Sequence, residues 1–308
     1  MARGERQQRR RERWFADGAA ALRRTLSASG TGVSLPDGEF YACPLCLMAY
    51  GRDAFEHRVF SDEHVPPHSM GGRVLVLTCA HCNHTAGTEM DADAAVREAV
   101  HDFIAGRSLG RALRAEYKIG EVTVQGSVTS ENGAVIMKVV PKANNPKDVE
   151  AMTETLTTWA GAGAGGSIGF RFRERLSPTA ASLSWVRAGY LAAFAALGWR
   201  YAFLECLNPL RAQFAAPEQG ILPPLSFFDP TAESGRRQLL IVEEPAEMRS
   251  LAVVLGRHTV FLPWVAEPKS MDEIAAGLAW YSALPASRRQ CTRKQIPWPA
   301  EPQYVLDQ

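Results

Sequence analysis

Two pairs of cysteines at CxxC spacing constrain the fold of this chain more than any other feature. Cys43-Pro-Leu-Cys46 is the first pair and Cys79-Ala-His-Cys82 is the second. Each CxxC unit forms a tight turn that directs two thiolates toward one point, and two units complete the tetrahedron that a structural zinc ion takes. We therefore expect the four cysteines to hold a structural zinc in a closed site, with no open position for chemistry.

A redox pair or four unrelated thiols would also account for four cysteines, but two CxxC units in one short segment argue against both. No apolar segment of the kind found in secretory signals follows the arginines at the N-terminus. The sequence therefore predicts a cytoplasmic protein, where clustered cysteines hold metal more often than they form disulfides. Cys206 and Cys291 stand alone, and we expect a core thiol and an exposed thiol without a role.

The composition is that of a globular chain. Of its 308 residues, 46% are hydrophobic and 22% are charged, which supplies enough apolar material for a core. The longest apolar run lies between Arg187 and Arg200, and its twelve residues are fewer than the ~20 that span a bilayer. We expect no membrane association. The length allows two domains of ordinary size or one large one.

The segment between the cysteine pairs contains side chains suited to hydrolysis. It includes Asp62-Glu63-His64-Val65-Pro66-Pro67 and then Gly71-Gly72, and Asn83 follows the second pair directly. Cleavage of a phosphodiester bond needs a base that activates water and a cation that stabilises charge on the phosphate. A histidine suits the first role near neutral pH. A carboxylate and an amide oxygen are hard ligands that suit magnesium or manganese.

This order of elements resembles the HNH (ββα-metal) endonuclease family, in the subgroup with paired CxxC zinc knuckles and an EHVxP motif. The matching letters are CPLC, EHVPP, GG and LTCAHCNHTAG. The resemblance implies a zinc-stapled ββα-metal domain with His64 as general base. It implies that Glu63 and Asn83 hold a catalytic magnesium or manganese ion. His84 follows Asn83 and is expected to contact phosphate. The implied activity is endonuclease cleavage of nucleic acid, with DNA as the expected substrate over RNA.

Two positions depart from the family pattern. Glu63 stands where aspartate is commoner, and its extra methylene shifts the expected metal position or preference. Val74 stands nine residues before Asn83, where the family usually has an asparagine that braces the catalytic loop. Three histidines lie close enough to compensate: His68, His81 and His84. The alternative to an enzyme is a catalytically inactive, zinc-stapled module that binds nucleic acid or a protein. In that case Val74 in place of the asparagine would reflect the loss of catalysis.

The N-terminus is strongly basic, although the formal net charge of the whole chain is only +1. Six arginines stand among the first thirteen residues against two glutamates: Arg3, Arg6, Arg9, Arg10, Arg11 and Arg13. This block predicts either a phosphate-binding segment or a frayed, solvated terminus. The spacing of apolar residues predicts a helix over residues 5–27. A Ser/Gly/Thr linker follows to residue 34.

The rest of the chain has the pattern of a larger α+β domain of no recognised family. The predicted strands are residues 122–128, 134–140, 239–242, 251–255 and 258–262. The predicted helices are residues 91–104, 149–159 and 178–197, the last one buried. Asn132-Gly133 and Gly256-Arg257 are predicted turns. Residues 161–169 are rich in glycine but lack the lysine of a phosphate-binding loop, so they are predicted to be an ordinary loop.

Phe170-Arg171-Phe172-Arg173 has two interpretations. It is either a basic strand face for nucleic acid or a half-buried strand with ordinary polar residues facing outward, and the second is favoured. The target choice of an HNH core usually comes from appended parts. We therefore expect the α+β region to select or sense the target, or to bind a protein partner.

The sequence thus predicts an α+β chain of four parts. They are a basic helix and linker (1–35), an HNH domain with structural zinc (36–105), an α+β domain (106–290) and an extended tail (291–308). Stand-alone HNH proteins with large unfamiliar domains resemble components of bacterial defence against foreign DNA, which is an analogy at the level of the fold. Strandedness of the target and oligomeric state stay open at this point.

Overall fold

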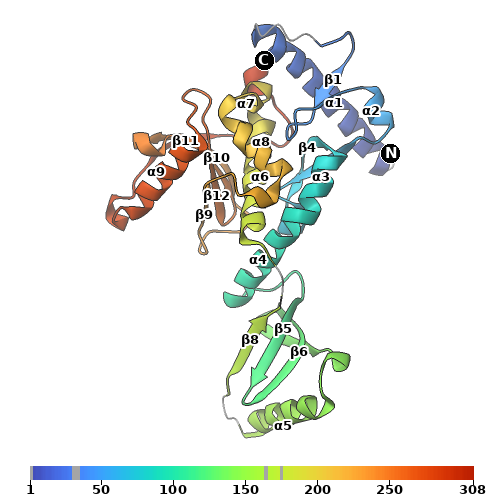
Figure 1. Ribbon diagram of the computed structural model, residues 1–308, viewed down its shortest axis with the longest axis vertical. Coiled ribbons are helices and arrows are strands. Elements are labelled where there is room, and N and C mark those ends of the chain that lie inside the picture. Colours follow the sequence, from blue (N-terminus) through green and yellow to red (C-terminus); the bar gives the residue numbers. More distant parts are fainter. Residues whose placement is uncertain (1–2, 30–34, 163–165, 174–175) are drawn as a thin grey trace. The chain divides into compact units, whose positions relative to one another are not determined.

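The computed structural model describes residues 3–29, 35–162, 166–173 and 176–308 (Figure 1). The expected mixture of helices and strands is confirmed. The chain forms two compact units: unit 1 comprises Met1–Ala92 and Thr179–Gln308, and unit 2 comprises Asp93–Pro178. This division differs from the predicted one, in which residues 106–290 are a single domain. The predicted linker and glycine-rich loop fall partly outside the described residues.

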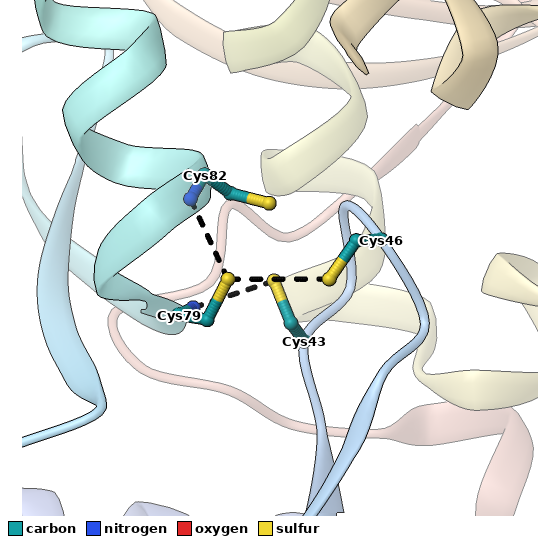
Figure 2. Close-up of side chains that lie close together, drawn as sticks. All are labelled: Cys43, Cys46, Cys79 and Cys82. Atoms are coloured by element: carbon teal, nitrogen blue, oxygen red, sulfur yellow. Dashed lines mark hydrogen bonds between the residues drawn. The ribbon is translucent and has the colours of Figure 1, made fainter.

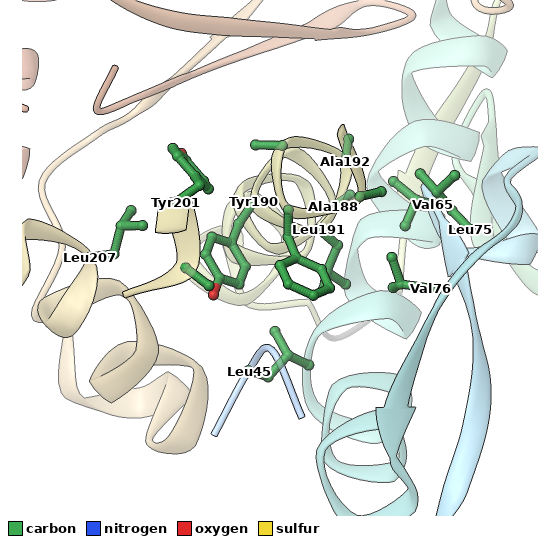
Figure 3. Close-up of a cluster of buried hydrophobic side chains, with 14 of the residues drawn as sticks. Leu45, Val65, Leu75, Val76, Ala188, Tyr190, Leu191, Ala192, Tyr201 and Leu207 are labelled. Carbon is green, nitrogen blue, oxygen red and sulfur yellow. The ribbon is translucent and has the colours of Figure 1, made fainter. Parts of the chain in front are cut away.

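Helix α6 (Pro178–Leu197) explains why the C-terminal part of the chain belongs to unit 1. The helix is apolar on every side, so every side has to be covered, and all but a few of its residues are buried. Figure 3 shows side chains around it that come from both segments of unit 1: Leu45, Val65, Leu75, Val76, Tyr201 and Leu207. Of the described helices, α6 alone is long and apolar enough to cross a membrane, and 94% of that window is buried inside the protein.

Helix α1 (Arg3–Ser29) packs on unit 1 through its middle and C-terminal turns, whereas residues 4–9 of its basic first turns are exposed. Trp14 and Phe15 are buried. The ring of Phe15 lies 5.8 Å from that of Tyr41, 5.5 Å from that of Phe55 and 5.7 Å from that of Phe60. The aromatic cluster fixes the basic N-terminal turns of α1 beside strand β3.

Two hairpins and a helix follow α1. The first hairpin pairs β1 (Phe40–Ala42) with β2 (Ala49–Gly51), and the short helix α2 (Asp53–Glu56) comes next. The second hairpin pairs β3 (Phe60–Val65) with β4 (Arg73–Cys79). Helix α3 (Ala80–Ala86) begins directly after β4. A π-helical turn (Gly87–Asp91) joins it to α4 (Ala92–Ile104), which is confirmed close to its predicted bounds.

The C-terminal part of unit 1 is a five-stranded antiparallel sheet in the order β13-β10-β11-β12-β9. The strands are β9 (Ser226–Phe228), β10 (Arg237–Glu244), β11 (Ser250–Leu255), β12 (His258–Leu262) and β13 (Thr292–Ile296). One face packs into the core around α6 through Leu251, Val253 and Val260. Helix α9 (Met271–Ala283) lies on the other face. The short helices α7 (Trp199–Ala202) and α8 (Asn208–Ala215) follow α6.

The predicted extended tail is instead part of the fold. Strand β13 pairs with β10 at the sheet edge. Near the C-terminus, the Asp307 carboxylate accepts hydrogen bonds from the backbone N–H groups of Trp199 at 2.6 Å and Arg200 at 3.0 Å. These N–H groups lie in the first turn of α7 and have no hydrogen-bond partner within the helix. A carboxylate is well suited to cap them. The Pro-rich composition gave no sign of this long-range cap.

Unit 2 is a four-stranded antiparallel sheet in the order β7-β6-β5-β8, with helix α5 (Pro146–Ala162). Its strands are β5 (Leu113–Ile119), β6 (Val122–Glu131), β7 (Ala134–Val139) and β8 (Ile168–Phe172). The Asn132-Gly133 turn is confirmed, with φ of 51° and 79°. Phe170 and Phe172 pack against Phe103. Arg171 and Arg173 form ion pairs with Glu116, so β8 fits the half-buried strand favoured above.

Candidate metal centre and hairpin site

Four thiols converge between the first hairpin and the start of α3 (Figure 2). The sulfur atoms of Cys43, Cys46, Cys79 and Cys82 all lie within 4.8 Å of one another, and those of Cys46 and Cys79 are 3.9 Å apart. A tetrahedral zinc with Zn–S bonds of about 2.3 Å places its sulfurs about 3.8 Å apart. The predicted four-cysteine cluster is thus confirmed, and its donors and spacing are compatible with structural zinc.

Local backbone geometry delivers the two cysteine pairs. The first pair sits in the turn between β1 and β2, where the Leu47 N–H donates to the Cys43 carbonyl at 2.8 Å and Leu47 has a φ of 58°. The second pair straddles the N-terminus of α3, where the Cys82 N–H donates to the Cys79 sulfur at 3.5 Å. The Cys79 N–H donates to the Cys43 sulfur at 3.3 Å. Such N–H donors stabilise thiolates, which are the form that binds metal.

His64 is half-buried on β3 and lies against a second histidine. The rings of His64 and His68 meet edge to face with centroids 5.1 Å apart. Burial lowers the pKa of His64 below its usual range, and the neighbouring His68 and Arg10 lower it further, against the opposing charge of Asp62. The imidazole is therefore neutral near pH 7, the form that accepts a proton.

Glu63 lies in a buried ion-pair network that the sequence did not reveal. Its side chain is 3% exposed, and Oε2 lies 2.6 Å from Nη2 of Arg187, which is 1% exposed. The Thr78 hydroxyl donates to the same oxygen at 3.2 Å. Nη1 of Arg187 lies 3.7 Å from Oδ2 of Asp91, whose Oδ1 accepts from the Ser184 hydroxyl at 2.6 Å. One guanidinium thus lies between two carboxylates.

Burial and charge act against each other in this network. Burial raises the pKa of Glu63 and of Asp91, and in both cases the guanidinium of Arg187 works in the opposite direction. A lone arginine in an otherwise apolar segment was the only signal in the sequence that could have pointed to this network. Its partners were not predictable, because they come from β3 and from the π-helical turn after α3.

Asn83 projects from α3 onto the strand that carries His64. Its Nδ2 donates to the Ser61 hydroxyl at 2.8 Å and approaches the Asp62 carbonyl at 3.5 Å. Because a carbonyl only accepts, the amide nitrogen faces β3. Among the described residues, no hydrogen bond reaches Oδ1 of Asn83, and none reaches Oε1 of Glu63. Each side chain is therefore held through one polar atom, and its other oxygen accepts no hydrogen bond within the described residues.

Val74 offers no side-chain hydrogen bond to the hairpin, and backbone hydrogen bonds organise the loop between β3 and β4. Val74 lies opposite His64 in the hairpin register, next to a β-bulge. In the connecting loop, the N–H groups of Met70 and Gly72 both donate to the Pro67 carbonyl, at 2.8 Å and 3.3 Å. A Cβ on Gly72 would lie 1.4 Å from the Pro66 carbonyl oxygen, so only glycine allows this close approach.

The remaining predicted histidines and the basic helix surround this hairpin. His84, His81 and His68 are exposed. From α1, Arg10 donates to the Asp62 carboxylate at 2.6 Å, and the Arg11 Nε lies 3.4 Å from the same group. In the described part of the chain, the four cysteines are the only group of three or more His, Cys, Asp or Glu side chains close enough to hold a metal.

Comparison with known proteins identified no relative of this chain. No protein-family model matches the chain, and neither curated proteins nor solved structures gave a match. Any functional conclusion therefore depends on the geometry of the site.

Proposed function

We propose that β3, β4 and α3 form the core of an HNH endonuclease, stapled by zinc at the four cysteines, that hydrolyses phosphodiester bonds of DNA. The observation that carries the proposal is the contact of Asn83 with Ser61 and Asp62. It brings the helix side chain against the strand stretch that ends in His64. Metal-assisted hydrolysis needs activated water and ligands for a divalent ion, and His64 and Asn83 are of the residue types that supply a base and a ligand.

In this proposal neutral His64 takes a proton from water as the water oxygen attacks phosphorus. The bond between phosphorus and the leaving sugar oxygen then breaks. Oε1 of Glu63 and Oδ1 of Asn83 would hold a magnesium or manganese ion, which supplies charge stabilisation for the phosphate and the leaving oxygen when bound. Arg187 and Ser61 orient these two ligands by engaging their other polar atoms. His84, which is exposed next to Asn83, would contact a neighbouring phosphate.

The proposed nucleic-acid partner also has a surface to bind. Arg10 and Arg11 are engaged with Asp62, whereas Arg6 and Arg9 are exposed and, among the described residues, have no ion-pair partner. These two guanidinium groups lie on the α1 turns beside the hairpin. Exposed arginines next to a hydrolytic site suit the phosphates that flank a cleaved bond.

A second function is favoured by one specific observation. Glu63 is buried, and its charge is already met by Arg187, as expected if the chain is an inactive zinc-stapled module that only binds nucleic acid. In such a module the buried ion pair would stabilise the fold, and no divalent ion would be needed. The two functions predict the same binding and different chemistry.

Plasmid cleavage distinguishes them. The purified chain is incubated with supercoiled plasmid and Mg²⁺ or Mn²⁺, and DNA binding is measured separately by mobility shift. For the enzyme, His64→Ala should reduce cleavage by roughly 10²- to 10⁴-fold, the usual contribution of a general base, while DNA binding and zinc content stay unchanged. His57→Ala, which removes another exposed histidine of unit 1, is the matched control. DNA binding without cleavage by the wild-type chain would support the inactive module.

A further inference from the structure

A cavity of about 440 Å³ lies on the face of the five-stranded sheet that points away from α6. Its floor consists of strand side chains, and α9 contributes one wall. The apolar lining includes Leu240, Val242, Ala252, Val254 and Phe261 from the strands, and Leu278 from α9. Small-molecule sites commonly enclose about 300–1,000 Å³ with a mainly apolar lining, and this cavity has both properties.

The depth of the cavity follows from the strand register. Leu240 on β10 pairs with Ala252 on β11, and Ala252 pairs with Phe261 on β12. Residues paired in this way share one face of the sheet. The small Ala252 side chain therefore lies between the larger side chains of Leu240 and Phe261, and the floor of the cavity is deepest at Ala252.

Helix α9 covers part of this face, where Leu278 and Tyr281 pack against the strand side chains. Gly277 of α9 packs so closely on the Ala246–Met248 turn that a Cβ would lie 2.2 Å from the Glu247 carbonyl oxygen. Ser270 and Glu273 fix the start of the helix with a capping box. The contact at Gly277 holds α9 against the Ala246–Met248 turn, and the helix lines the cavity with Leu278, Tyr281 and Ser282.

Positive charge lines the cavity as well. Arg236, Arg257 and Arg293 all contribute to its wall, against one carboxylate, Asp229. That carboxylate already accepts from the N–H and hydroxyl of Thr231, at 2.9 Å and 2.6 Å. In the part of the chain that the structure describes, neither Arg236 nor Arg293 forms an ion pair with a carboxylate.

Arg236 is the best placed of these groups to receive an acid. Its Nε and Nη2 donate to the neutral amide of Gln238 at 3.0 Å and 2.7 Å, which orients the guanidinium without cancelling its charge. Phe227, another lining residue, is 47% exposed. An exposed aromatic ring near a positive group suits a ligand that is apolar along its body and anionic at one end.

We infer that this cavity binds a small organic acid with an apolar, ring-containing body. The body lies over Ala252 and against Phe261 and Phe227, and the acid group pairs with Arg236. This inference does not depend on the proposed nuclease activity, because every residue that carries it belongs to the C-terminal sheet or to α9.

The test uses 8-anilinonaphthalene-1-sulfonate, an aromatic sulfonate whose fluorescence rises in apolar sites, titrated into the full chain. We expect one high-affinity site per chain. Arg236→Gln should weaken binding roughly tenfold through loss of a charge-assisted contact. Ala252→Phe should abolish binding by filling the floor. Phe227→Ala changes an exposed residue, so it should weaken binding at least severalfold while the melting temperature stays unchanged.

Arg288→Gln is the matched control, because Arg288 is exposed nearby and does not line the cavity. It should leave the affinity unchanged. The inference is overturned if the wild-type chain shows no saturable site. It is equally overturned if Phe227→Ala and Arg236→Gln bind the probe as the wild type does, or if Arg288→Gln loses as much affinity as Arg236→Gln.

Discussion

The buried ion pair between Arg187 and Glu63 offers the sharpest test of the fold. Arg187→Met keeps an unbranched apolar stem and removes the charged guanidinium, which leaves Glu63 and Asp91 without their shared partner in the core. Removing one partner of a buried pair costs about 3–5 kcal/mol, because the other charge stays buried without compensation. For a domain of about 150–250 residues each kcal/mol lowers the melting temperature by about 2–4 °C, so we expect a fall of roughly 6–20 °C.

The loss should depend on pH in a defined direction. Burial raises the pKa of Glu63 and Arg187 opposes the rise, so the variant raises the folded-state pKa further. A carboxyl group with a raised folded pKa costs no stability while it is protonated in both states. It costs increasing stability as the pH climbs from the unfolded value of about 4.3 through the folded one. The difference between variant and wild type should therefore be small near pH 4 and large at pH 7.

Scanning calorimetry from pH 4 to pH 8 measures both effects. Glu63→Gln combined with Arg187→Met removes both charges and should recover much of the loss. Arg249→Met is the matched control, since it breaks the exposed pair with Glu267, which contributes about 0–1 kcal/mol. A loss at pH 7 no larger than that of the control would refute the reasoning. A double variant as unstable as Arg187→Met alone would refute it as well.

Three further predictions follow from the same structure. Cys46→Ser should lower the bound zinc measured by elemental analysis and reduce thermal stability, whereas Cys291→Ser should change neither, because Cys291 lies outside the cluster. Replacing both Arg6 and Arg9 by Gln should weaken DNA binding and make the slope of log K against log salt shallower by roughly 2, at about 0.9 per phosphate contact; an unchanged slope would remove α1 from the DNA-binding surface. Gly72→Ala should destabilise the β3–β4 hairpin, because its Cβ would lie 1.4 Å from a carbonyl oxygen, and wild-type amide exchange in the hairpin would contradict this.

Local patterns predicted the elements well. The bounds of α6 match the prediction from Pro178 to Leu197, and β11 and β12 with their Gly256 turn match closely. The cysteine cluster followed from spacing alone, since two CxxC turns have few ways to arrange their sulfurs. Each of these features depends on residues near one another in the chain or on one strong chemical preference.

Long-range partners were not predictable in the same way. The sequence suggested a boundary after residue 105, whereas the structure keeps residues 179–308 in one core with residues 3–92. Nothing in the local pattern says that an apolar helix will be covered by two distant segments. The cap on α7 from Asp307 and the pairing of Glu63 with Arg187 belong to the same class, because they depend on tertiary packing.

The charge count around Arg187 bears directly on both proposed functions. Glu63 and Asp91 together carry two negative charges when ionised, and Arg187 supplies one positive charge between them. If Asp91 were absent, the Glu63–Arg187 pair would be neutral. A divalent ion would then find no net negative charge near the amide of Asn83. With Asp91 present, one net negative charge remains on this side of the hairpin. In the proposed enzyme, the arginine that neutralises Glu63 in an inactive module would instead orient it, and an ionised Asp91 would supply the negative charge that attracts a divalent ion.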